Sequence, residues 1–342
     1  MRVAVVGATG NVGTALLRRL QRVPEVSSIV GISRKGPDRD GEPYDGVEWY
    51  RADVADVNST GPLAAAFAGA DIVFDLVWAI RPNRDQDLLR RTNVDGNRRV
   101  FEAVAAAKVP RLVVASSIGA YGPADKLRRY DESHPTTGTP TSHYGAQKAE
   151  VERILDAFER EHPEVSVARL RPGLIFQPAA APEIKDYFLG NLVPAKLIEG
   201  IRLPIMVFPK GIRAQAVHAD DIAEAYWTVA TSGETGAFNV AAEPVIGPRA
   251  AKQIVGATRV FQVPPPIFRG LLSLTYALRI QPTDPGWIDM AMNVPVMDTS
   301  RIRSLGWSET HDSRDVLRSV IDNLAGDEGL GNAGHRSKSP RE

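Results

Sequence analysis

Tyr144 and Lys148 stand four residues apart in a segment with a helical pattern, so both side chains are expected on one face of a helix. An unperturbed tyrosine has a pKa of about 10 and is a poor base near neutrality. A neighbouring ammonium group favours the phenolate and lowers that pKa. The pair alone is weak evidence, because this spacing arises by chance in many helices. Ser117 strengthens it, because this hydroxyl follows a predicted strand at 112–115, and open α/β sheets bind ligands at the carboxyl ends of their strands.

Three glycines near the N-terminus, Gly7, Gly10 and Gly13, follow a short apolar run at 3–6 and lead into an amphipathic segment. This order predicts a strand, a tight turn and a helix. Gly7 permits the sharp turn, Gly10 the close approach of a ligand, and Gly13 close packing of helix on strand. The amides at the start of the helix suit a dinucleotide pyrophosphate. The alternative is an ordinary glycine-rich turn between a strand and a helix.

The end of the second predicted strand, residues 28–32, bears on which dinucleotide would bind. A carboxylate there would accept hydrogen bonds from both ribose hydroxyls and favour NAD. The chain instead has Ser33, Arg34 and Lys35, with no acidic residue before Asp38. Because a guanidinium group can hold a 2′-phosphate with its planar fork, we expect NADP to be preferred, with NAD as the alternative. A solvated basic loop would explain the same residues.

The elements that would position these residues alternate along the first half of the chain. This alternation predicts an α/β fold with a Rossmann-type doubly wound parallel sheet. The predicted strands are 3–6, 28–32, 47–51, 72–76, 112–115, 165–170 and 237–240, and the predicted helices are 12–22, 62–68, 85–107, 144–161 and 216–230.

Frequent prolines after Arg171 indicate a smaller, mixed α/β C-terminal substrate domain. We expect residues 1–170 plus 214–243 to form the dinucleotide-binding domain. Residues 171–213 plus 244–324 are expected to form the substrate domain. The stretch 325–342 is rich in Gly, Ser and charged residues and is expected to be a disordered tail.

Bulk composition excludes several kinds of chemistry. The 342 residues include 41 Lys and Arg and 41 Asp and Glu, so the balanced charge favours neither a nucleic-acid nor a membrane partner. No cysteine is present and the six histidines are scattered, so we expect no disulfide and no metal site. No signal-peptide pattern precedes the first strand, and a cytoplasmic location is expected. A helical pattern after Pro266 carries several leucines but only Arg269 and Arg279, so a membrane-surface anchor is not expected.

Together these motifs resemble the extended short-chain dehydrogenase/reductases, also called the NAD-dependent epimerase/dehydratase family. The resemblance runs from Met1 to about Leu324. It is carried by Gly7-x-x-Gly10-x-x-Gly13, Asp53, Ser117 with Tyr121-Gly122, Tyr144-x-x-x-Lys148, Arg171-Pro172, Val217-His218-Ala219-Asp220-Asp221-Ile222, and Asp298-Thr299-Ser300 through Leu305-Gly306-Trp307.

The resemblance implies a catalytic set of Ser117, Tyr144, Lys148 and Asn93. Tyr144 would exchange a proton with a substrate hydroxyl or carbonyl oxygen, and Lys148 would lower its pKa and bind the nicotinamide ribose. Ser117 would hold the same substrate oxygen while hydride moves at the adjacent carbon. Asn93 would support the active site through water and backbone, although it could merely cap a helix.

The cofactor contacts that the motifs and the resemblance imply are Gly7, Thr9, Gly10, Asn11, Val12, Gly13, Ser33, Arg34, Asp53, Val54, Leu76, Val77, Tyr144, Lys148 and Pro172. Asp53 could meet the adenine amino group, but Asp is also a common turn residue. Tyr121 is expected in a packing or pocket-wall role, and His218 is expected to hold structure through hydrogen bonds.

Departures from the family pattern narrow the function. Dehydratases of the family carry an acidic pair where this chain has Ile118 and Gly119, so dehydration is disfavoured. Leu174 and Ala214 replace the Asn and Arg that nucleotide-sugar enzymes usually carry, although Arg213 stands one residue away. The leading hypothesis is an NAD(P)-dependent oxidoreductase acting on a secondary alcohol or ketone. A UDP-sugar 4-epimerase with tightly bound NAD is the alternative, and a non-catalytic dinucleotide-binding redox sensor is a further one.

The expected partner is a small-molecule substrate. Apolar residues that could line its pocket, or belong to the core of the small domain, are Trp78, Phe176, Tyr187, Phe188, Leu189, Leu192, Leu197, Ile198 and Met206. Many relatives dimerise through the helices that correspond to 85–107 and 144–161, so a homodimer is one expectation. Val100, Val104, Ile154 and Leu155 could serve that interface or pack on the sheet.

Overall fold

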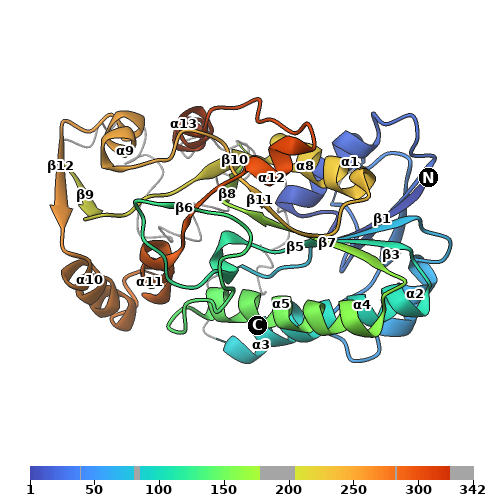
Figure 1. The fold of residues 1–342 in the computed structure, drawn as a ribbon. Coiled ribbons are helices and arrows are strands. Elements are labelled where there is room, and N and C mark those ends of the chain that lie inside the picture. The colour runs from blue at the N-terminus through green and yellow to red at the C-terminus, as the bar shows by residue number, and fades with distance from the viewer. Residues whose placement is uncertain (39, 81–84, 178–204, 282, 324–342) are drawn as a thin grey trace, which may run out of the picture.

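A parallel sheet of seven strands forms the centre of the protein (Figure 1). The computed structural model describes residues 1–38, 40–80, 85–177, 205–281 and 283–323. The strand order is β11-β7-β5-β4-β1-β2-β3. The bounds are β1 (Arg2–Val6), β2 (Ser28–Ser33), β3 (Val47–Arg51), β4 (Ile72–Asp75), β5 (Arg111–Ala115), β7 (Ser166–Pro172) and β11 (Gly236–Val240). The predicted doubly wound α/β fold is confirmed.

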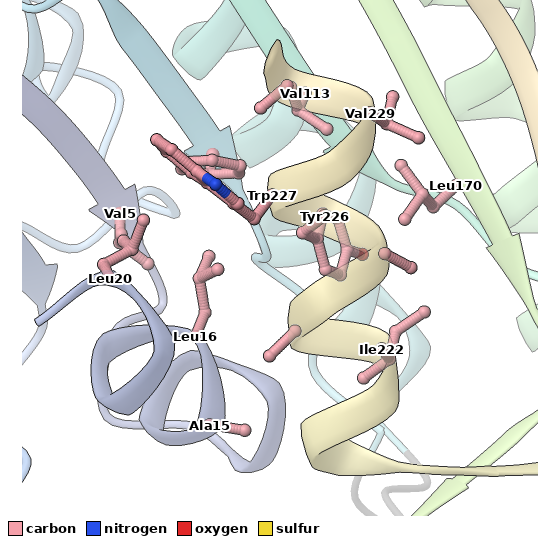
Figure 2. Close-up of a cluster of buried hydrophobic side chains, with 14 of the residues drawn as sticks. Val5, Ala15, Leu16, Leu20, Val113, Leu170, Ile222, Tyr226, Trp227 and Val229 are labelled. Carbon is pink, nitrogen blue, oxygen red and sulfur yellow. The ribbon is translucent and has the colours of Figure 1, made fainter. Parts of the chain in front are cut away.

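Helices cover both faces of this sheet, which explains why the interior positions of its central strands are mostly apolar on both faces. One face carries α1 (Asn11–Leu20) and α8 (Ala219–Ser232), and the other carries α2 (Thr60–Ala66), α4 (Gly96–Ala106) and α5 (His143–Glu161). Figure 2 shows the first layer, where side chains of α1 and α8 meet those of the sheet. The labelled members of this core are Val5, Ala15, Leu16, Leu20, Val113, Leu170, Ile222, Tyr226, Trp227 and Val229.

Three two-stranded sheets and several helices lie outside the central sheet. The strand pairs are β8 (Leu174–Phe176) with β10 (Ala216–His218), β9 (Ile205–Pro209) with β12 (Arg259–Val263), and β6 (Arg129–Tyr130) with β13 (Val296–Met297). The helices are α9 (Pro248–Val255), α10 (Pro265–Ala277), α11 (Gly286–Asn293), α12 (Ser300–Ser304) and α13 (Ser313–Asn323).

Two predicted helices differ from the structure. The segment predicted as one helix at 85–107 consists of α3 (Gln86–Arg90), a π-helical turn (Arg91–Asp95) and α4. The predicted helix at 216–230 begins only at Ala219, because residues 216–218 pair with β8. Both differences come from contacts distant in the sequence, which a local pattern does not contain.

The helices proposed for a dimer interface use much of their apolar surface within the chain. Val100, Val104 and Leu155 are buried in the core beneath α4 and α5, and Ile154 packs against the same core. These residues therefore serve the sheet, and a homodimer stays a prediction.

Some predictions fall outside the described residues. These are Tyr187, Phe188, Leu189, Leu192, Leu197, Ile198 and the tail at 325–342. Within the described ranges, none of the helices has the length and apolar character needed to cross a membrane.

Candidate active site

The glycine turn joins β1 to α1 at the centre of the sheet. Gly7 has a φ of +83°, and its amide donates to the Ile32 carbonyl at 2.9 Å. A Cβ atom on Gly13 would lie only 2.3 Å from the Gly7 carbonyl oxygen, so the helix packs too closely for a larger residue. No side chain caps α1 at Gly10, and Asn11 Oδ1 is buried without a hydrogen-bond partner. An uncapped helix N-terminus beside a tight glycine turn fits a dinucleotide pyrophosphate.

Other predicted cofactor contacts lie around this turn or at the carboxyl ends of other strands of the sheet. The Leu76 carbonyl oxygen lies 3.2 Å from where a Cβ on Gly7 would stand, so the ends of β4 and β1 meet there. Val77 follows Leu76, and Thr9 and Val12 belong to the turn and the first turn of α1. Pro172 is buried at the end of β7.

A basic surface surrounds the end of β2. Ser33 Oγ accepts a hydrogen bond from the Gly36 amide at 2.9 Å, while Arg34 and Lys35 are exposed. Arg51 pairs with Ser33 in the sheet, and its Nε lies 3.8 Å from the position of a Cβ on Gly36. Sequence reasoning missed Arg51, because only the parallel register of β2 and β3 brings it to this loop.

Asp53 and Val54 occupy the turn after β3. Asp53 Oδ1 accepts a hydrogen bond from the Ala55 amide at 3.0 Å, which is the turn role that its residue type allows. Val54 is buried, and a Cβ on Gly96 would lie 2.7 Å from its Cγ2 atom. The contact of Asp53 with adenine therefore stays a prediction.

Ser117, Tyr144 and Lys148 meet at the carboxyl end of β5. Helix α5 is capped by Ser142, whose Oγ accepts a hydrogen bond from the Gly145 amide, so Tyr144 lies in the first turn and Lys148 in the second. Ser117, two residues after β5, lies near enough to the Tyr144 phenol to lower its pKa. Lys148 Nζ donates to the carbonyl oxygen of the residue that ends β5, Ala115, at 2.7 Å. The structure thus brings together three of the predicted catalytic residues.

Burial governs the electrostatics of this site. It raises the pKa of Tyr144 to about 12, against the smaller lowering effect of the hydrogen bond with Ser117. Burial also lowers the pKa of Lys148 to about 7, against the opposing effect of nearby carboxylates. The sequence predicted that Lys148 would lower the pKa of Tyr144. Without a cofactor the structure does not show this effect, because burial has the largest influence on the pKa of both residues.

Asp75 is a further buried ionisable group at the site, and sequence reasoning did not identify it. Its Oδ1 accepts a hydrogen bond from the Val77 amide at 3.1 Å, and its Oδ2 is buried without a hydrogen-bond partner. Burial raises the pKa of Asp75 to about 7, against the lowering effects of the Val77 hydrogen bond and the positive charge of Lys148. Asp75 in turn favours the ammonium form of Lys148.

Two indole rings flank the Tyr144 ring. The Trp78 ring meets it edge-on with centroids 5.5 Å apart, and the Trp287 ring lies tilted on it at 5.0 Å. Lys148 Nζ lies 3.5 Å from the Trp78 ring centroid. Sequence reasoning named Trp78 but missed Trp287, which reaches the site because α11 packs close to the start of α5. A Cβ on Gly286, at the start of α11, would lie 2.2 Å from the carbonyl oxygen of Thr141.

Asn93 supports the loop that carries Trp78. Its Oδ1 accepts a hydrogen bond from the Ala79 amide at 2.6 Å, and its Nδ2 donates to the Ala79 carbonyl and to Gln147 Oε1. The residues preceding α3 and α4 are Asp85 and Asp95, so Asn93 does not cap either helix. It connects the loop after β4 to α5, and it lies in the π-helical turn that interrupts the predicted helix.

A buried polar network lies behind the site. Both oxygens of Glu152 accept hydrogen bonds from Arg171, each at 2.8 Å, and Glu152 Oε1 also accepts one from Ser116. Tyr121 is fully buried, accepts a hydrogen bond from Arg171 and donates to Asn239 Oδ1. Arg171, near the end of β7, and Tyr121 therefore stabilise the elements that surround the site.

His218 has a structural position. Its Nδ1 accepts a hydrogen bond from the Asp220 amide and so caps α8, and its ring stacks on His311 with centroids 4.0 Å apart. Among the described residues, no group of His, Asp and Glu side chains is arranged to hold a metal ion.

Comparison with known proteins identifies the class of protein. The model of the NAD dependent epimerase/dehydratase family matches residues 3–241, and the chain belongs to this family. It is 26% identical over 254 residues to an uncharacterized protein of Mycobacterium bovis, a match covering 71% of this chain and 63% of that protein. The chain thus spans less than two thirds of the length of that relative.

Several relatives have a named activity. The L-arabinose 1-dehydrogenase (NAD(P)(+)) of Haloferax volcanii is 29% identical over 195 residues, covering 54% of this chain and 70% of that enzyme. The structure of Thermus thermophilus UDP-glucose 4-epimerase in complex with NAD superposes with a TM-score of 0.69 at 21% identity, covering 96% of this chain and 100% of that one. At this identity the structural likeness shows the fold alone.

Proposed function

We propose that the protein is an NAD(P)-dependent oxidoreductase that transfers hydride at a secondary alcohol or ketone, with Tyr144 as the acid/base. The observation that carries this proposal is the convergence of Ser117, Tyr144 and Lys148 at the carboxyl end of β5, with Ser117 near enough to the Tyr144 phenol to lower its pKa and Lys148 in the next turn of the same helix. The nicotinamide, when bound, supplies or accepts the hydride. Ser117 and Tyr144 hold the substrate oxygen, and Tyr144 gives a proton to that oxygen in reduction or takes one in oxidation.

Lys148 assists by its charge. Asp75 favours the ammonium form of Lys148 against burial. With a nicotinamide bound, this ammonium is expected to favour the Tyr144 phenolate, an effect that burial outweighs in the protein alone. The two indole rings of Trp78 and Trp287 exclude water around the Tyr144 ring and give the substrate an aromatic wall.

Dehydratase chemistry is not supported at this site. A Cβ on Gly119 would lie 2.7 Å from Tyr144 Cε1, so no carboxylate fits at this position without moving the tyrosine. β-Elimination needs an acid and a base beside the substrate, and the residue before Gly119 is the apolar Ile118.

Replacing Tyr144 by Phe tests the mechanism. Turnover of a ketone by the Tyr144→Phe variant should fall at least about 100-fold, because the proton donor is lost, while NADPH affinity stays nearly unchanged. A ketone and sugar panel followed at the nicotinamide absorbance supplies the substrate. Full activity of the variant with that substrate would contradict the proposed role of Tyr144.

We also propose NADP as the preferred cofactor, since Arg34, Lys35 and Arg51 surround the end of β2. The Arg51→Ser variant should raise the Kd for NADPH about tenfold and leave that for NADH within about twofold, because one charge-assisted phosphate contact is lost. Arg22→Ser, at an exposed arginine at the end of α1, is the matched control. An equal rise of the Kd values for NADPH and NADH would contradict a 2′-phosphate site.

A UDP-sugar 4-epimerase is the second candidate, supported by the retained Ser117, Tyr144 and Lys148. This activity predicts a dinucleotide that copurifies and no net cofactor consumption. Leu174 is 40% exposed in β8, where nucleotide-sugar enzymes of the family usually have an Asn. Failure of UDP-sugars to shift the Tm would count against this candidate.

A further inference from the structure

Helix α10 carries a stripe of apolar side chains that face solvent. The stripe consists of Ile267, Leu271, Leu274 and Leu278, which are 64%, 60%, 57% and 60% exposed. Their spacing of four, three and four residues places all of them on one side of the helix. Isolated exposed leucines are common on protein surfaces, but a contiguous row of this kind marks an interaction site.

The same end of the molecule exposes further apolar groups. Val207 of β9 and Phe261 of β12 are paired in the parallel register and are 49% and 51% exposed. Figure 1 shows β9, β12 and α10 together at the end of the protein opposite to α1 and the N-terminus. Ile280, just after α10, is 47% exposed.

The charge of this end differs from that of the rest of the chain. Residues 244–283 contain five Lys or Arg and no Asp or Glu, although the whole chain is balanced at 41 of each sign. Arg269 is paired with Asp289 of α11. Within the described part of the chain, no ion pair is recorded for the other four cations, Arg249, Lys252, Arg259 and Arg279.

We propose that this end of the protein, the α10 end, docks on the surface of an anionic lipid bilayer. Exposed apolar side chains in a segment with an excess of cations favour the headgroup region of anionic membranes. A second copy of the chain fits less well, because pairing two α10 ends would bring two cationic segments together. The docking is peripheral, since α10 has only 13 residues.

The surface also connects to the active site. Arg269 of α10 is paired with Asp289 of α11, and α11 carries Trp287 against the Tyr144 ring. Docking through α10 therefore places the α11 side of the site next to the lipid. This inference departs from the expectation of no membrane partner, which considered only Arg269 and Arg279 on the helical segment. The structure adds the exposure of the four apolar side chains and brings β9 and β12 to the same end of the molecule.

Co-sedimentation of the full chain with vesicles tests the proposal. We expect binding to vesicles of phosphatidylcholine with about a third phosphatidylglycerol, little binding to phosphatidylcholine alone, and loss of binding in roughly 0.5 M salt. The Leu271→Ser/Leu274→Ser variant should bind about tenfold more weakly or worse. The Arg259→Glu/Arg279→Glu variant should lose the preference for anionic vesicles.

The matched control is Val57→Ser/Leu88→Ser, which removes two side chains that are 74% and 40% exposed, one after β3 and the other on α3. It should bind vesicles like the unmodified chain. Far-ultraviolet circular dichroism melts check that all variants fold. Absence of binding to anionic vesicles, or equal binding by the stripe variant, would overturn the proposal. So would light scattering that shows a dimer which the stripe variant dissociates, because a second copy would then cover the stripe.

Discussion

Gly119 sets the position of the proposed acid/base, and replacing it by Ala tests that arrangement without removing a reacting group. The new Cβ would lie 2.7 Å from Tyr144 Cε1 and 2.9 Å from Met290 Sδ. Ordinary contacts of this kind begin at 3.4 Å. The Met290 side chain is flexible and gives way, but the Tyr144 ring lies between two indoles. The ring must therefore shift by about 0.7 Å or push an indole aside.

The expected effect follows from this displacement. Overpacking of a well-packed site costs about 1–3 kcal/mol, so the Tm should fall by only a few degrees. A displacement approaching 1 Å of a reacting group costs up to about 100-fold in rate. We therefore expect kcat for the Gly119→Ala variant to fall between about tenfold and 100-fold, with the Kd for NADPH within about twofold.

The assay compares kcat, cofactor Kd and Tm with those of Gly61→Ala. Gly61 lies in α2, and a Cβ there meets nothing within 4 Å. The control should keep its activity and gain slightly in stability, because Ala favours a helix. Unchanged kcat in Gly119→Ala, or an equal loss in the control, would refute the reasoning.

Two further predictions concern buried charges. Burial opposes ionisation of Glu152, but hydrogen bonds and charges from Arg171 and Arg169 outweigh it and hold its pKa at about 2. Ionised Glu152 therefore stabilises the folded protein at any pH above its unfolded pKa of about 4.3. This contribution is lost as the pH falls from about 4.3 toward 2, so the Tm should drop over that pH range. Glu152→Gln should flatten this drop while lowering the Tm at pH 7, and an unchanged acid limb would contradict the assignment. Asp75→Asn should lower the pKa of Lys148 below about 7, because a carboxylate that favours the ammonium is removed. If the ammonium form of Lys148 is needed for ketone reduction, kcat/KM should then begin to fall at a lower pH than in the unmodified enzyme. An unchanged pH profile on the alkaline side would contradict the link between Asp75 and Lys148.

Much of the fold could be predicted from the sequence because it depends on local patterns. The apolar runs of β1 and β2, the glycine turn between β1 and α1, and the four-residue spacing of Tyr144 and Lys148 are each encoded within about twenty residues. The predicted secondary structure was wrong where contacts with a segment distant in the sequence determine the local structure. Residues 216–218 form a strand because they pair with β8, and the helix at 85–107 breaks where Asn93 binds the loop after β4.

The sequence by itself determined the class of fold and the family, and it predicted the three residues that the structure brings together at the candidate site, because each depends on residue types at short spacing. The tertiary structure alone decided what surrounds them. Trp287 reaches Tyr144 from more than a hundred residues away, and Arg51 reaches the end of β2 through the sheet. The exposure of the α10 leucines is also decided by the tertiary structure. A helical pattern gives the spacing of apolar residues, but it does not say whether another element covers them.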